Sequence, residues 1–156
     1  RVISANFLHK EIREKGGAYG SGMSVGQDGV LEFYSYRDPN VSQTLSTFDR
    51  AAEWFLSRDN VSQRDVDEAK LNLLTVQPSG PGSKGRSHFV HGFTDSFRQS
   101  YHDRIFSVTH EDMERVVEKY LTDASANAKA SVAMFGVSGT VKAKDGWKIK
   151  TISFDQ

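Results

Sequence analysis

Cysteine is absent from the 156 residues, which excludes disulfides, thiol nucleophiles and cysteine-ligated zinc. An excess of either charge is absent too, since 20 basic residues balance 20 acidic ones. Nucleic-acid binding normally needs a basic face that shifts this balance, so we expect no nucleic acid among the partners. No apolar run approaches the roughly 20 residues that cross a bilayer, and we expect no membrane span. The length and the 37% hydrophobic share indicate one folded domain.

The chain also lacks the common zinc-binding patterns. Neither His-Glu-x-x-His nor its inverse, His-x-x-Glu-His, occurs. His88 and His91 could share a helix face, but without a third ligand they indicate a solvated or hydrogen-bonded pair. His9 and Glu11 match the His-x-Glu of zinc deaminases, which also require a cysteine pair. We therefore expect no metal site on this chain.

Nucleotide and serine-hydrolase motifs are missing as well. The glycine-rich stretch 16–29 follows a helix pattern and opens a strand pattern, which is the reverse of the dinucleotide fingerprint. No Gly-Lys-Ser/Thr triplet is present for a phosphate loop, and Gly-x-Ser-x-Gly does not occur. The chain therefore carries no complete catalytic site of these kinds.

The first part of the chain predicts a helix followed by a hairpin. Apolar residues recur at helical spacing over 2–15, and Gly16 and Gly17 then suit a left-handed helix end. Strand patterns follow at 18–25 and 30–36, separated by an Asp-Gly turn signal. The apolar helix positions are Ile3, Phe7, Leu8 and Ile12.

Two further helices are predicted next, the first over 40–56 and the second from Ser62 to about residue 77. Asn40 and Asn60 each begin an Asn-Val-Ser sequon, which we interpret as a helix N-cap rather than a glycosylation site. Gln43 lies at the capping-box position of the first helix, and an aspartate lies three residues after Ser62 in the second. The proline- and glycine-rich stretch 78–85 predicts a loop between packed helices.

The last third predicts two more helices and two strands. Aromatic residues every four positions indicate one helix with a buried aromatic face, and Thr109 caps a helix that runs to Leu121. Strand patterns occupy 130–135 and 147–154. We therefore predict an α+β fold, with a mainly antiparallel sheet and helices packed on one face. The aromatic positions are Phe89, Phe93, Phe97 and Tyr101, and the inward positions of the next helix are Met113, Val116, Val117, Tyr120 and Leu121.

One constellation remains open to a functional interpretation. Arg13 lies in the last turn of the first helix and Tyr19 opens the following strand, so that both flank the turn at Gly16 and Gly17. In that strand the face opposite Tyr19 carries glycine or serine, including Gly20, and we expect a helix or another backbone to approach it closely. The simpler alternative is that Arg13 satisfies the carbonyls at the helix end and Tyr19 is half-buried.

Two segments carry a resemblance to a known family. The run 7–20, Phe-Leu-His-Lys-Glu-Ile-Arg-Glu-Lys-Gly-Gly-Ala-Tyr-Gly, and the segment 34–40 closely resemble the C-terminal domain of presequence proteases. These proteases are pitrilysin-like (M16) zinc metallopeptidases and form subfamily C of that family. The segments 67–70, 83–85 and 108–111 also fit, so the resemblance covers most of the chain.

The resemblance implies that zinc binding and substrate binding are carried by different modules of a longer polypeptide. Members have four related α+β modules in two halves that close around a peptide, with zinc held in the first module. The last module supplies an arginine and a tyrosine, which correspond to Arg13 and Tyr19, to hold the substrate carbonyl and stabilise its oxyanion. Gly16, Gly17 and Gly20 would line the substrate beside them. The substrates implied are targeting presequences and other short unstructured peptides.

The chain lacks the family's zinc motif, and we expect residues 1–156 to be one module that starts inside its first helix. The resemblance then implies a mitochondrial matrix enzyme, or one of the chloroplast stroma or another organelle, whose zinc lies in the N-terminal half. The chain alone is expected to be inactive. The alternatives are a noncatalytic M16-like subunit for peptide binding or assembly, and an independent binding domain unrelated to proteolysis.

Overall fold

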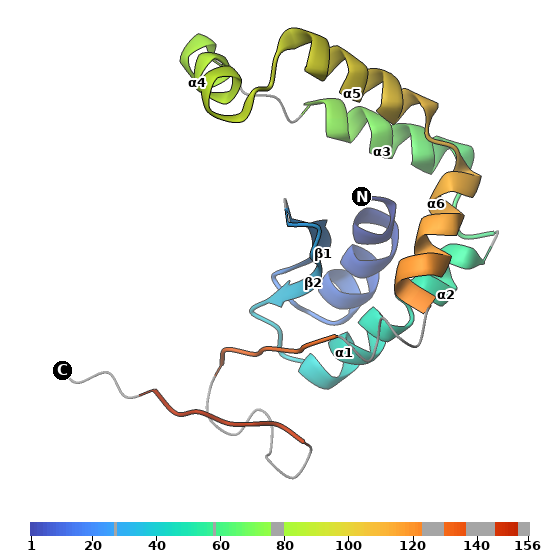
Figure 1. Cartoon of the computed structure of the whole chain (residues 1–156). Coiled ribbons are helices and arrows are strands. Elements are labelled where there is room, and N and C mark those ends of the chain that lie inside the picture. Colours follow the sequence, from blue (N-terminus) through green and yellow to red (C-terminus); the bar gives the residue numbers. More distant parts are fainter. Residues whose placement is uncertain (27, 58, 76–79, 123–129, 137–145, 153–156) are drawn as a thin grey trace.

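The chain has an α+β fold in which a short antiparallel sheet is combined with a larger set of helices (Figure 1). The computed structural model describes residues 1–26, 28–57, 59–75, 80–122, 130–136 and 146–152. Along the chain, the elements are η1 (Ile3–Lys15), β1 (Gly20–Val25), β2 (Leu31–Tyr36), α1 (Val41–Asp49), α2 (Ala51–Leu56), α3 (Gln63–Thr75), α4 (Pro81–His91), α5 (Asp95–Ser107), α6 (His110–Val117) and η2 (Glu118–Thr122).

Strands β1 and β2 form the predicted hairpin. They pair antiparallel from Gly20 opposite Tyr36 to Val25 opposite Leu31. The turn closes through backbone bonds, from the N–H of Gly26 to the carbonyl of Val30 over 2.9 Å, and the backbone N–H of Val30 also donates to Oδ1 of Asp28 over 3.1 Å. Gly29 follows with φ +80°, a conformation that glycine adopts without steric cost. The Asp-Gly signal therefore predicted this hairpin correctly.

Helix η1 is wound as a π-helix and packs on one face of β1. Ser4 Oγ accepts the backbone N–H of Met23 over 2.9 Å, and Ser21 Oγ donates to the carbonyl of Leu8 over 3.1 Å. The helix therefore lies on the face that carries Ser21 and Met23. The predicted close approach of a helix to the opposite, glycine-bearing face is wrong. Beside Gly22 on that face lies the ring of Tyr34, its cross-strand partner.

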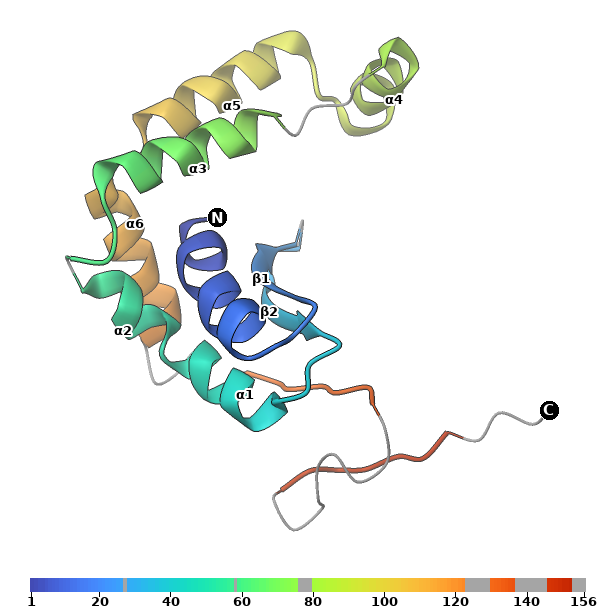
Figure 2. The same cartoon turned by 180° about the vertical axis from the view of Figure 1, so that it is seen from behind.

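The apolar core surrounds η1. Figures 1 and 2 show this helix between the β1–β2 hairpin on one side and α2 with α6 on the other. Phe7 stacks on Trp54 with ring centroids 5.0 Å apart, and Phe33 stacks on Phe48 at 5.2 Å. The core thus joins the first helix, the sheet and the helices that follow it. Its buried members are Val2, Ile3, Phe7, Leu8, Ile12, Ala18, Ala51, Ala52, Phe55, Val61, Val66 and Val117.

The second predicted helix is broken into α1 and α2 at Arg50. Asn40 takes the N-cap position of α1, but its Nδ2 donates to the carbonyl of Gly16 over 2.8 Å instead of capping the helix. Asn60 donates to the carbonyl of Trp54 over 2.9 Å and precedes α3 by more than one residue. Asn40 is therefore the N-cap residue of α1, as predicted, but its side chain does not cap the helix, and the predicted capping box with Gln43 is not formed. The prediction that Asn60 caps the next helix is wrong, because its side chain bonds the carbonyl of Trp54 and the helix starts later.

The start of α3 is confirmed. Ser62 and Asp65 cap it reciprocally, since the backbone N–H of each residue donates to the side chain of the other. Helix α3 lies beside α5, as both views show, and Lys70 Nζ donates to the carbonyl of Phe106 over 3.1 Å (Figure 2). The predicted end of the third helix near residue 77 lies outside the described residues.

The predicted single aromatic helix is two helices, α4 and α5. Gly92 ends α4 with φ +68°, and the hydroxyl oxygen of Thr94 accepts the backbone N–H of Phe97 to start α5. Helix α4 also begins at Pro81, within the stretch 78–85 that was predicted to be a loop, because proline suits the first turn of a helix.

The aromatic side chains of α4 and α5 are not buried in this chain. Phe89 is 92% exposed, and Phe93 and Phe97 stack on each other at the surface, with ring centroids 5.2 Å apart. Tyr101 is also exposed. The predicted core packing of this aromatic face is therefore wrong for the chain as described.

Helix α6 starts at the predicted cap. The hydroxyl oxygen of Thr109 accepts the backbone N–H of Asp112, and the Asp112 carboxylate accepts the backbone N–H of Thr109 in return. Of the positions predicted to face inward, Val117 is buried and Met113 and Leu121 pack against the core. Val116 and Tyr120 are exposed, so these two predictions are wrong.

The C-terminal segments differ most from the sequence prediction. Residues 130–136 and 147–152 form neither helix nor strand, so the strands predicted at 130–135 and 147–154 are wrong wherever the structure describes them. The last residues of the second predicted strand lie outside the described part. Within the described ranges, none of the helices combines the length and the apolar character that a bilayer crossing requires.

Candidate functional site

The turn between η1 and β1 is the candidate site, and glycine makes it possible. Gly17 has φ +78°, and a Cβ on Gly16 would lie 2.5 Å from the carbonyl oxygen of Ile12. The backbone N–H of Gly17 donates to the carbonyl of Arg13, and that of Ala18 donates to the carbonyl of Ile12, both over 3.1 Å. The predicted left-handed helix end is therefore confirmed. The turn brings Ala18 into contact with Ile12, and these two residues directly precede Tyr19 and Arg13 in the chain.

Arg13 projects from the last turn of η1 and is exposed. Its Nη1 lies 2.9 Å from Nε2 of His9, while the N–H of Gly17 satisfies its backbone carbonyl. The Nδ1 atom of His9 lies 3.2 Å from Oε1 of Glu14. The simpler alternative for Arg13, a bond from its side chain to the carbonyls at the helix end, is therefore not the arrangement found. The guanidinium is held by a side chain on the helix surface.

Tyr19 is held through its backbone and leaves its ring accessible. Its N–H donates to the carbonyls of Tyr36 and Arg37, over 3.0 and 3.4 Å. The ring meets that of Tyr36 edge to face at 6.0 Å, and the Arg37 guanidinium carbon lies 5.7 Å from the Tyr19 ring centroid. The residue is 66% exposed, so the simpler alternative, in which Tyr19 is half-buried, is not the arrangement found. A phenol in this position can donate a hydrogen bond to a molecule outside the chain.

The three glycines predicted to bind substrate lie in different surroundings. Gly16 and Gly17 are required by the turn itself, as the contact with Ile12 and the positive φ show. Gly20 begins β1, and a Cβ built there would meet no atom within 4 Å. The space beside its backbone is open, while contact of these glycines with a substrate stays a prediction.

The surroundings of Arg13 and Tyr19 include residues that the sequence analysis did not assign to this site. His9 contacts Arg13, and Tyr36 and Arg37 contact Tyr19. The spacing of four residues between His9 and Arg13 was a usable signal, because such pairs are neighbours on a helix surface. Arg37 offered no comparable signal, since it contacts Tyr19 only once the hairpin has formed and its own backbone has φ +49°.

A cavity of about 280 Å³ lies beside this site, between η1, the hairpin and α3. His9 and Tyr34 line one part of it, and Asp65 and Glu68 of α3 line another. The hydroxyl and the backbone N–H of Ser62 donate to Asp65 and lower the pKa of this carboxyl below its usual range, with a further contribution from the amide of Asn6. Asp65 therefore places a negative charge on this cavity wall near neutral pH, opposite in sign to Arg1, which also lines the cavity.

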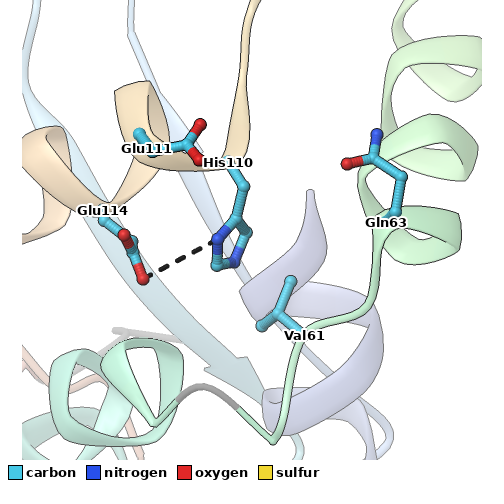
Figure 3. Close-up of a pocket in the computed structure, with 5 residues that line it drawn as sticks. All are labelled: Val61, Gln63, His110, Glu111 and Glu114. Atoms are coloured by element: carbon cyan, nitrogen blue, oxygen red, sulfur yellow. Dashed lines mark ion pairs between the residues drawn. The ribbon is translucent and has the colours of Figure 1, made fainter.

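A second cavity, of about 400 Å³, lies at the start of α6 and opens beside His110 (Figure 3). The His110 imidazole points into it, with Nδ1 3.7 Å from Oε1 of Glu114 and the ring stacked on Phe55 at 5.9 Å. Its Nε2 is buried and has no hydrogen-bond partner among the described residues. This cavity is formed by other elements than the turn that carries Arg13 and Tyr19.

The described residues include no cluster of side chains suited to a metal ion. No three histidine, aspartate or glutamate side chains are grouped there in a way that could hold a metal ion. His110 and Glu114 form a pair without a third ligand of this type. The described part of the chain therefore does not fit a zinc centre.

The sequence that includes this turn matches a known family. Residues 1–135 match the family model described as the PreP C-terminal domain. The chain belongs to this family. It is 45% identical over 153 residues to the mitochondrial presequence protease of Xenopus tropicalis, covering 96% of this chain and 15% of the relative.

Two other relatives show the same partial coverage. The mitochondrial presequence protease of Mus musculus is 40% identical over 153 residues, which are 96% of this chain and 14% of the relative. That of Schizosaccharomyces pombe is 43% identical over 125 residues, which are 78% of this chain and 12% of the relative. The chain thus spans about 15% or less of the length of these curated relatives.

Proposed function

We propose that this chain is the C-terminal substrate-binding part of a zinc metalloendopeptidase that degrades targeting presequences and other short unstructured peptides. Membership of the PreP C-terminal domain family supports this, as do relatives that are named presequence proteases. The observation that carries the proposal is the η1–β1 turn, which presents Arg13 and Tyr19 from its two ends. Both side chains are accessible to a partner molecule.

Arg13 would bind a carbonyl oxygen of the peptide. A guanidinium is charged at any physiological pH and donates several hydrogen bonds from one plane. It therefore stabilises a carbonyl oxygen more strongly as negative charge develops on it, which favours the transition state over the bound peptide. The exposed position in the last turn of η1 leaves the guanidinium able to reach an incoming backbone.

Tyr19 would supply a second, neutral donor to the same peptide. Its phenol is exposed, while its ring is fixed by the edge-to-face contact with Tyr36 and by the Arg37 guanidinium. The ring is thereby oriented without using its hydroxyl. Two donors on a rigid turn can orient the peptide for attack, an arrangement that lowers the barrier without new covalent chemistry.

The metal would be held elsewhere in the full-length protein, because the described residues do not fit a zinc centre. When bound, zinc would activate the water that hydrolyses the peptide. The active site would then form where this turn meets the remaining modules, and closure would complete it. The relatives are named mitochondrial, which supports a mitochondrial location for this protein.

The experiment compares variants of the full-length protein in cleavage of a fluorogenic presequence peptide. Arg13→Ala and Tyr19→Phe should each lower kcat at least about tenfold, the loss seen when a transition-state donor is removed. Zinc content and thermal unfolding should stay at their wild-type values. Lys10→Ala is the matched control, since Lys10 is an exposed cation on the same helix. Wild-type turnover in both Arg13 and Tyr19 variants would refute the proposal.

A second measurement tests whether the groups that activate water lie outside this chain. The isolated chain should show no peptidase activity with or without added zinc, because the groups that activate water are expected on other modules. Adding a separately expressed N-terminal part of the protein should restore activity. Cleavage by the pure chain that a chelator abolishes would contradict this assignment.

A further inference from the structure

We propose that His9 is a positioning residue that holds the Arg13 guanidinium in place through Nε2, while Glu14 fixes the tautomer of the imidazole through Nδ1. The proposal rests on the role of Arg13 given above. It adds that a neighbouring side chain restricts the position of this exposed arginine before substrate binds. The observations behind it are the two contacts of His9, at 2.9 Å to Arg13 and 3.2 Å to Glu14.

The chemistry of the three groups determines where the protons lie. A guanidinium has donors and no acceptor, so Nε2 of His9 must accept the hydrogen bond from Arg13. In a neutral imidazole the other nitrogen then carries the proton, and Nδ1–H faces the Glu14 carboxylate, which can only accept when ionised. The two hydrogen bonds therefore run in one direction, from Arg13 to His9 and from His9 to Glu14.

The winding of η1 explains why one histidine meets both partners. In a π-helix the hydrogen bonds join residues five apart, so residues four and five positions after His9 both lie one turn along the same face. Arg13 and Glu14 are these two residues. They flank the imidazole, and the arrangement is built into the same helix turn that ends at Gly16 and Gly17.

Holding Arg13 matters because the side chain is long and exposed. A free arginine samples many rotamers and must lose that freedom on binding a peptide. The contact with the His9 ring, which Glu14 orients, restricts the rotamers of Arg13 before a peptide binds. The guanidinium is therefore pre-organised, and less conformational entropy is lost on binding. His9 would touch neither substrate nor metal, and would act through Arg13 alone.

The contact with Arg13 requires a neutral His9 imidazole. An imidazolium has no acceptor and carries the same charge as the guanidinium, so the contact becomes repulsive. Other charged or titratable groups around His9 are Asp65 and Glu68 of α3, Tyr34 of β2 and Arg1, which line the adjoining cavity. Asp65 is bound to Ser62 and Asn6, and Glu68 to Arg64 at 2.8 Å, so Glu14 is the carboxylate in direct contact with the ring.

The test compares His9→Gln and His9→Leu in the full-length protein. Glutamine keeps one acceptor and one donor but takes up no proton, whereas leucine removes both. His9→Leu should lower kcat about tenfold with a smaller change in KM, as expected for a misplaced transition-state group. His9→Gln should restore most of kcat. Lys10→Leu, at an exposed neighbouring position, is the matched control.

A second readout does not depend on activity. Phenylglyoxal modifies arginines, and mass spectrometry of digested protein gives the modification rate at Arg13. The rate should rise several-fold in His9→Leu and stay near wild type in His9→Gln. Equal rates and equal kcat in His9→Leu and wild type would overturn the positioning role. If Arg13→Ala leaves turnover unchanged, the proposed function of Arg13 fails, and the modification rates still decide whether His9 holds it.

Discussion

The backbone N–H of Ala18 donates to the carbonyl of Ile12 over 3.1 Å, and this bond ties the first strand of the hairpin to the end of η1. It closes a turn that passes through Gly17 in a left-handed conformation. Because Arg13 and Tyr19 stand next to the two bonded residues, the position of both candidate side chains depends on this turn. The chain's contribution to a peptide site is therefore set by backbone geometry as much as by the two side chains.

Gly17→Ala should loosen this turn. A left-handed conformation costs a residue with a Cβ about 1–2 kcal/mol, so the local free energy of opening should fall by that amount. Hydrogen–deuterium exchange of the peptides covering η1 and β1 in the full-length protein measures this. Gly20→Ala is the control, because a Cβ there meets no atom within 4 Å. Equal exchange in both variants would show that the turn does not need a glycine at position 17.

Gly22 and Tyr34 should be energetically coupled across the hairpin. A Cβ on Gly22 would lie 2.7 Å from the Tyr34 hydroxyl oxygen, at the far end of a half-exposed side chain, so Gly22→Ala should push this ring aside at a cost of about 0.5–1.5 kcal/mol. In a Tyr34→Ala background the clash is gone, and the same change should be neutral or stabilising, because alanine loses less conformational freedom on folding than glycine does. The double-mutant cycle is read by exchange of the β1 peptides. Additive effects would contradict the packing described here.

The start of α6 should depend on pH through Asp112. The backbone N–H and the hydroxyl of Thr109 hold the pKa of the Asp112 carboxyl below its usual value. Because its pKa is lower in the folded chain, the ionised Asp112 stabilises the start of α6 at pH values above about 4, the ordinary pKa of aspartate. This stabilisation is lost as the pH falls through the folded-state pKa. Exchange of the α6 peptides, corrected for intrinsic rates, should therefore rise on acidification.

Asp112→Asn provides the matched control for this pH effect. An asparagine cannot ionise, so α6 should open more easily at neutral pH and respond much less to acid. The account of the cap would be contradicted by a variant that keeps the wild-type response to acid.

Local signals explain which parts of the fold were predictable. The Asp-Gly turn, the paired glycines and the Thr109 cap each involve residues within a few positions of one another, and the structure confirms them. Asn40 has the right position for a cap, but its amide reaches Gly16, which is 24 residues away in the chain. A sequence pattern does not show such a distant acceptor.

Longer-range features account for the other errors. The periodic aromatic residues suggested one buried helix, yet Gly92 ends α4 and the aromatic side chains lie at the surface. Strand patterns at 130–135 and 147–154 describe side chains that suit a sheet, whereas a strand also needs a partner with free hydrogen-bonding groups. The described residues there are not paired with a strand.

The candidate site was predictable in part for the same reason. Arg13, Gly17 and Tyr19 are close in the chain, and their turn follows from local rules. The contacts of Tyr19 with Tyr36 and Arg37 arise only when the hairpin has formed. The contact of Arg13 with His9 was partly predictable, because a spacing of four residues suggests it. The additional contact of His9 with Glu14 depends on the π-helical winding, which the sequence does not show.

Photo-cross-linking tests most directly whether this turn contacts peptide. The full-length protein with Tyr19→p-benzoyl-phenylalanine is irradiated with a presequence peptide, and the products are mapped by mass spectrometry. The same replacement at Tyr101, an exposed tyrosine of α5, is the control. The account predicts cross-links from position 19 to the peptide backbone near the cleaved bond, well above those from position 101. Equal or absent cross-linking at position 19 would contradict it.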